Sequence, residues 1–192
     1  MDTTLWIIIA IVAVVVVAAL AIGWYTAQQK RSENLRRGFG SEYDRTVDEY
    51  GDKGKAESEL RERQKRVSKF DIKPLDPNDR ERYAKSWAAT QARFVDAPAE
   101  AVGEADGLVN EVMRARGYPM GDFDQQAADI SVDHPHVVEN YRSARAIAER
   151  NEAGEATTED LRQAMVHYRE LFNDLLEGDA EVMEAQRETV QR

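Results

Sequence analysis

The chain has 192 residues, a formal net charge of −10 and no cysteine. The absence of cysteine excludes a disulfide framework and a CxxC metal motif, and it is compatible with either side of a membrane. The acidic balance argues against nucleic acid as a partner, because an acidic surface repels the phosphate backbone.

Residues 5–25 contain no charged residue, although the rest of the chain is intensely polar. A helix of this length is about 31 Å long, which matches a bilayer hydrocarbon core of roughly 30 Å. Trp6 lies at one end of the run, and Trp24 and Tyr25 lie at the other, where amphipathic rings favour the headgroup level. The sequence therefore predicts one transmembrane helix over residues 5–25, after a short tail at residues 1–4.

The charges beside the apolar run predict its orientation. Lys30, Arg31, Arg36 and Arg37 follow the run, whereas no Lys or Arg precedes it. The positive-inside rule then places the N-terminus outside a bacterial plasma membrane and the C-terminal part in the cytoplasm. Together with the three aromatic residues, these four form the predicted membrane-interface set. They either contact anionic headgroups or serve as ordinary stop-transfer charges.

A cleaved signal peptide is the alternative to an anchor. Such a peptide has a basic n-region, an apolar stretch of about 7–15 residues and a small-residue cleavage site. The first four residues here carry an acid and no basic residue, and Ala21, Ile22 and Gly23 resemble only a weak cleavage site. We therefore favour an uncleaved anchor over an extracytoplasmic protein.

Residues 26–75 are predicted to form a charged helical neck. Gly38 and Gly40 end the helix that leaves the membrane, and residues 41–50 form a short helix. Residues 55–70 form a third helix with three Glu–Arg pairs at i,i+4 spacing. Because Arg63 interrupts its apolar positions, we expect a solvated amphipathic strut instead of a coiled coil. The net charge is +3 over residues 30–73 and −12 over residues 74–192.

Residues 76–178 are predicted to form an acidic bundle of four to five helices, and no segment alternates like a strand. Asp76 before Pro77 is typical of a helix start. This first helix should extend to about Val95, and Val95 should lie on one face with its aromatic residues. Apolar stripes over residues 101–113 and 161–176 indicate two core helices that pack against each other. Gly178 should end the last helix, which leaves a polar tail over residues 179–192.

One group of side chains could carry chemistry. Asp133, His134 and His136 lie within four residues, and they could ligate zinc or another divalent metal if His167 came close. General acid–base use is a second hypothesis. The structural alternative is that Asp133 caps a helix that Pro135 starts, with local hydrogen bonds from the histidines. We favour that alternative, and we therefore expect no metal, no cofactor and no catalytic residue.

Six segments carry a resemblance to a known family. They are residues 38–47, 82–87, 91–96, 116–119, 131–141 and 158–168, and they include GFGSEYDRTV and SVDHPHVVENY. The chain resembles a family of uncharacterised bacterial single-pass membrane proteins, often labelled only as hypothetical or secreted. The resemblance covers most of the region after the apolar run. It implies no activity, ligand or catalytic residue.

We expect a membrane-anchored, non-catalytic adaptor or scaffold whose acidic helical domain binds a protein partner beside the bilayer. The alternative is a metal- or small-ligand-binding sensor or enzyme that uses Asp133, His134, His136 and His167. Homo-oligomerisation through the anchor or neck is a third hypothesis, although the apolar run contains no GxxxG motif.

Overall fold

The computed structural model describes the backbone of residues 3–190 and the side chains of residue 16 and residues 18–177. Every regular element in residues 3–190 is an α-helix, which confirms the predicted all-α class. The helices are α1 (Thr3–Phe39), α2 (Ser41–Tyr50), α3 (Lys53–Val67), α4 (Pro77–Arg93), α5 (Pro98–Arg116), α6 (Phe123–Asp133), α7 (Val138–Glu152) and α8 (Thr158–Val190).

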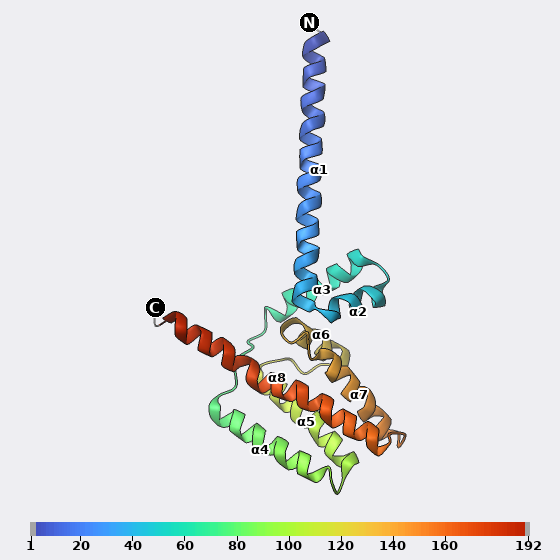
Figure 1. Cartoon of the computed structure of the whole chain (residues 1–192), viewed down its shortest axis with the longest axis vertical. Coiled ribbons are helices and arrows are strands. Elements are labelled where there is room, and N and C mark those ends of the chain that lie inside the picture. Colours follow the sequence, from blue (N-terminus) through green and yellow to red (C-terminus); the bar gives the residue numbers. More distant parts are fainter. Residues whose placement is uncertain (1–2, 191–192) are drawn as a thin grey trace.

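α1 is one continuous helix that projects from the rest of the molecule (Figure 1). The large apolar side chains described between residues 16 and 25 of this helix are exposed, including Trp24 at 72% and Tyr25 at 68%. Among the residues with described side chains, no helix is both long and apolar enough to cross a bilayer. Residues 5–15 and 17 of the predicted span, Trp6 included, lie outside that part of the chain.

The neck consists of α2, α3 and the C-terminal end of α1, which pack together below the projecting part of α1 (Figure 1). Gly40 has a φ of 52°, a conformation that lets the chain turn sharply from α1 into α2. A small apolar cluster fills the neck and comprises Leu35, Phe39, Tyr43 and Leu60. Helix α2 has the predicted bounds.

The prediction that the third neck helix is a solvated strut was wrong. α3 packs on α2 and α6, and it buries its apolar positions Ala56, Leu60 and Val67. Arg63, which seemed to interrupt that stripe, is itself buried because carboxylates surround its guanidinium. The helix begins at Lys53 because the Asp52 side chain accepts a hydrogen bond from the backbone N–H of Lys55.

The bundle consists of α4 to α8 and shares one apolar core. As predicted, α5 packs against α8, and α7 packs against α8 as well. Trp87 of α4 stacks on Phe172 of α8 with 4.7 Å between ring centroids, which fixes α4 at the edge of the bundle. Asp76 caps α4 as predicted, since its side chain accepts from the N–H groups of Asn78 and Asp79.

Three predicted details of the bundle were wrong. Val95 is 82% exposed, because α4 ends at Arg93 and leaves Val95 in the following turn. Asp133 ends α6 and does not cap the next helix, because residues 134–137 form a turn and α7 begins at Val138. Gly178 does not end α8, which continues to Val190, since a glycine inside a helix costs only about 1 kcal/mol.

Residues 68–76 join the neck to the bundle, and most of this linker is attached to the bundle. The N–H of Lys73 donates to the carbonyl of Arg116 at 2.9 Å, and Leu75 is buried in the bundle core. Gly117 has a φ of +98°, and a Cβ there would lie 2.3 Å from the carbonyl oxygen of Asp71. The close approach therefore requires glycine at this position.

Candidate functional site

A buried carboxylate joins the neck to the bundle. Glu42 of α2 has a side chain only 1% exposed, and it accepts two hydrogen bonds from Arg142 of α7, at 2.7 and 2.8 Å. Arg63 of α3 donates to the same carboxylate at 2.8 Å. Paired guanidinium donors give strong, directional hydrogen bonds to a carboxylate. Glu42 is therefore saturated by donors from both the neck and the bundle.

A second ion pair joins the same two parts with the opposite polarity. Arg66 of α3 donates through Nε to Asp129 of α6 at 2.8 Å, and Asp129 also accepts from Gln125 of its own helix at 2.9 Å. Nearby, Val132 of α6 packs against the apolar cluster of the neck. We call this set the seam: Glu42, Arg63, Arg66, Asp129, Val132 and Arg142. The neck therefore folds back onto the bundle.

The neck also contains a polar cluster, which lies nearer to the apolar run along α1 than the apolar cluster of the neck does. Ser32 of α1 and Tyr43 of α2 donate to Oε1 of Glu57 on α3, at 2.5 and 2.9 Å. Lys53 and Arg61 lie 3.7 and 3.8 Å from the same carboxylate. One side chain from each of three helices thus converges on one point, which fixes the direction in which α1 leaves the neck.

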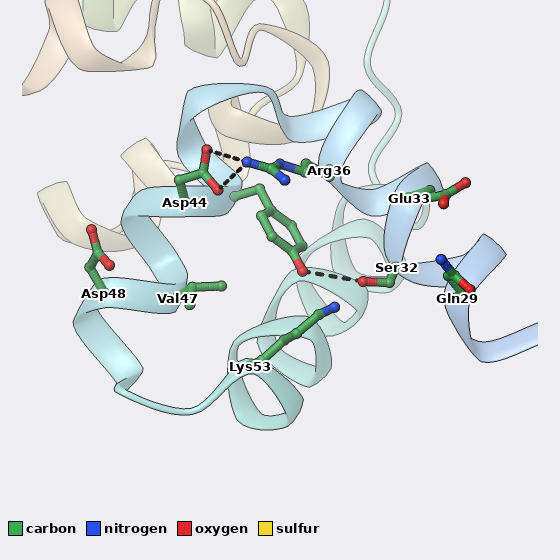
Figure 2. Close-up of a pocket in the computed structure, with 9 residues that line it drawn as sticks. Gln29, Ser32, Glu33, Arg36, Asp44, Val47, Asp48 and Lys53 are labelled. Atoms are coloured by element: carbon green, nitrogen blue, oxygen red, sulfur yellow. Dashed lines mark hydrogen bonds and ion pairs between the residues drawn. The ribbon is translucent and has the colours of Figure 1, made fainter. Parts of the chain in front are cut away.

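An open pocket of about 340 Å³ lies over this cluster. Figure 2 shows Arg36 of α1 paired with Asp44 of α2 at one side, while Lys53 extends from α3 toward α1. The lining mixes acids and bases, and its other residues are Gln29, Ser32, Glu33, Tyr43, Val47 and Asp48. Because the cations already have carboxylate partners, this lining does not select an anionic ligand.

The environment of Glu57 keeps this carboxylate ionised. Burial by itself would raise the pKa of Glu57, but the hydrogen bonds from Ser32 and Tyr43 and the charges of Lys53 and Arg61 lower the pKa below its usual value. A carboxylate held in its charged form is a structural anchor and not a proton donor at neutral pH.

The structure gives different surroundings to the predicted membrane-interface residues. Trp24, Tyr25, Lys30 and Arg31 are exposed on α1, and neither basic residue forms an ion pair with another described side chain. Trp6 lies outside the described side chains. Arg36 pairs with Asp44, and Arg37 donates to Asn34 at 2.5 Å. The two residues nearest the apolar run therefore have free charges, whereas the two farther along have partners in the neck.

The four predicted metal ligands do not converge. Asp133 accepts a hydrogen bond from Tyr118 at 2.9 Å, and His167 contacts the side-chain oxygen of Asn140 at 2.9 Å. His134 and His136 come together, but on Asp174 of α8, which the sequence did not single out. Within the described part of the chain, no three His, Cys, Asp or Glu side chains are placed to hold a metal ion.

Asp174 connects α8 to the turn before α7. One carboxylate oxygen contacts Nδ1 of the buried His134, and the other lies 2.7 Å from Nε2 of the exposed His136. Burial would raise the pKa of Asp174, but hydrogen bonds and charge from the two histidines lower it below its usual value. The Nε2 of His134 faces Arg116 at 3.4 Å, so this Asp–His pair does not point at a nucleophile.

A third polar network lies between α5, α7 and α8. Asp106 accepts from Tyr168 at 2.8 Å and from Arg145 at 3.3 Å, while Tyr141 donates to Gln126 at 2.9 Å. Burial raises the pKa of both tyrosines far above the usual value, so each stays a neutral donor. This network satisfies polar groups inside the bundle and leaves no free base there.

Two acids of the seam, Glu42 and Asp129, and the acid that holds the two histidines, Asp174, were not predicted from the sequence. Each looks like a surface acid in an amphipathic helix. No local pattern in the sequence distinguishes Glu42 from the exposed acids around it. Comparisons of the chain with protein-family models, with characterised proteins and with solved structures found no match.

Proposed function

We propose that this protein is a membrane-anchored, non-catalytic adaptor that holds an acidic helical bundle beside a bilayer for a protein partner. The main support for this proposal is that α1 is a single unbroken helix from Thr3 to Phe39. It joins the exposed apolar residues to the packed neck without a flexible linker. A bilayer is the environment in which this apolar surface would be covered.

The distance along α1 supports a bundle held close to the membrane. Among the side chains of α1 that the structure describes, Ser32 is the first buried one, seven residues after Tyr25. Seven residues of helix span about 10 Å, and the headgroup layer on each side of a bilayer is roughly 5–8 Å thick. The neck would then begin just outside the headgroups.

The exposed charges on α1 support the proposed orientation. Lys30 and Arg31 follow the apolar run and have no partner among the described side chains, so they are available to anionic headgroups. Under the positive-inside rule, these charges support a bundle that lies in the cytoplasm of a bacterial cell. An extracytoplasmic bundle is the outcome that would contradict this part of the proposal.

The chemistry of the buried acids supports binding over catalysis. Glu42 and Glu57 are buried and Asp174 is partly buried, and the carboxylate of each already has two or more hydrogen-bond partners among the side chains around it. The large negative charge of the bundle favours a partner with a basic surface.

Carbonate extraction of membranes tests the anchor. A V16R/L20R variant puts two charges into the apolar run, at about 3 kcal/mol each near the helix centre. The control Q28R adds one arginine to the exposed part of α1 beyond the run. We expect the parent and Q28R to stay in the membrane pellet and V16R/L20R to move to the supernatant. Extraction of all three proteins would contradict the proposal.

Affinity capture of the full-length tagged protein from detergent extracts tests the adaptor role. We expect the same partner in independent captures, with recovery that falls as salt rises, because charge attraction to an acidic bundle is screened. No retained protein at low salt in repeated captures would contradict this role.

A further inference from the structure

The seam contains two ion pairs of opposite polarity. The neck contributes a carboxylate to one pair, Glu42 with Arg142, and an arginine to the other, Arg66 with Asp129. Each pair crosses between the two parts, and both carboxylates are buried. Buried pairs are costly to form unless their hydrogen bonds are complete, and here they are well supplied with donors.

Each carboxylate of the seam also has a donor on its own side. Glu42 keeps Arg63 within the neck, and Asp129 keeps Gln125 within α6. If the two crossing contacts broke, neither carboxylate would lose its last partner. Separation of the neck from the bundle would therefore leave neither buried carboxylate unpaired, and an unpaired buried charge is the usual large cost of breaking such a pair.

The apolar part of the seam is small. Val132 is the side chain of the bundle that packs, partly buried, against the neck cluster. The bundle has a large apolar core of its own, and the neck has its own four-residue cluster. Because the apolar contact is small, the ion pairs make up most of the seam. Small, polar interfaces permit relative motion of the parts that they join.

The linker has a place for a hinge. Residues from Asp71 to Leu75 are attached to the bundle through Lys73, Leu75 and the close approach at Gly117. Residues 68–70 form only short-range turns with the end of α3 and lie between the two attached parts. A change in the backbone of these three residues would reorient the neck without disturbing either core.

We infer that the seam is a reversible ionic latch. When Arg142 and Arg66 hold Glu42 and Asp129, the neck and the bundle form one body. When both pairs are broken, the bundle swings away about residues 68–70 while both parts stay folded. The latch sets whether the bundle is held at a fixed position relative to α1, and it operates whether or not α1 lies in a bilayer.

Distance measurement between two spin labels tests the latch in the full-length protein in detergent. The chain has no cysteine, so D48C on α2 and A146C on α7 give a specific pair of labels at exposed positions. We expect one narrow distance distribution in this parent. Adding R66A and R142A should shift the distribution to longer and broader distances.

A matched control distinguishes the effect of breaking the latch from the effect of removing any arginine. Arg145 lies on the same helix as Arg142 but pairs with Asp106 inside the bundle, so R145A should leave the distribution unchanged. Circular dichroism should show equal helix content in the parent and in R66A/R142A. An unchanged distance in R66A/R142A would overturn the inference. A shift accompanied by loss of helix content would overturn it as well.

Discussion

The carboxylates of Glu42, Asp129 and Asp174 explain most of the polar architecture, and each has a hydrogen-bond partner from a distant part of the chain. Glu42 receives an arginine 100 residues later in the sequence, and Asp174 receives a histidine 40 residues earlier. An acid in an amphipathic helix is ordinarily solvated, and its burial depends on partners that a local pattern does not contain. This is why these residues could not be predicted from the sequence.

Replacing Glu57 tests the polar cluster of the neck. E57Q removes the charge that Ser32, Tyr43, Lys53 and Arg61 surround, so we expect a loss of about 1–3 kcal/mol in unfolding free energy at pH 7. Urea denaturation followed by circular dichroism measures the difference. E62Q, at an exposed position on the same helix, serves as the control and should change stability by less than about 0.5 kcal/mol.

The same variant has a pH dependence with a definite sign. Because the folded protein lowers the pKa of Glu57 below 4.5, the charged form stabilises the fold above that pH. This contribution is lost as the pH falls through the lowered pKa. The stability difference between the parent and E57Q should therefore be constant from pH 7 to about pH 5 and shrink at lower pH. A difference that grows in acid would contradict this account.

Asp174 gives a second test at the residue scale. D174N weakens the contact with the buried His134, so we expect a loss of about 1–3 kcal/mol at pH 7. H136Q changes a histidine whose side chain is 67% exposed, and it should cost less than about 0.5 kcal/mol. Thermal unfolding of both variants measures this. Equal losses would show that the exposed histidine, and not the buried one, makes the important contact.

At the scale of elements, helix positions followed well from local chemistry. The apolar stripes of α5 and α8 and the Asp76–Pro77 start of α4 predicted the bundle, because capping and 3.6-residue periodicity are local properties. Predictions failed where the tertiary context decides. Arg63 looked like a break in a stripe, yet it is buried beside Glu42, and Asp133 looked like a cap, yet it accepts from Tyr118.

Two glycine substitutions of opposite sign test the element boundaries. G117A places a Cβ against the carbonyl of Asp71 at a positive φ, so we expect a loss of about 2–3 kcal/mol. G103A lies within α5 with open space around it, so it should gain about 0.5–1 kcal/mol from helix propensity. Thermal unfolding compares the two. Similar effects of both substitutions would contradict the close packing of the linker on α5.

At the scale of the whole molecule, the arrangement of neck and bundle was not predictable. The sequence indicated a charged segment between an apolar helix and a bundle, but not whether that segment extends or folds back. That choice depends on the seam, where Glu42, Asp129 and Val132 meet side chains from other helices. The charge difference between the basic neck and the acidic bundle was visible, and it agrees with their docking.

The proposed anchor and its orientation make the central claim about this protein. Protease treatment of intact and lysed spheroplasts that express the full chain with a C-terminal tag tests that claim most directly. We predict that the tag is protected in intact spheroplasts and digested only after lysis, which would place the bundle in the cytoplasm. Digestion of the tag in intact spheroplasts would contradict the orientation and place the bundle outside the membrane.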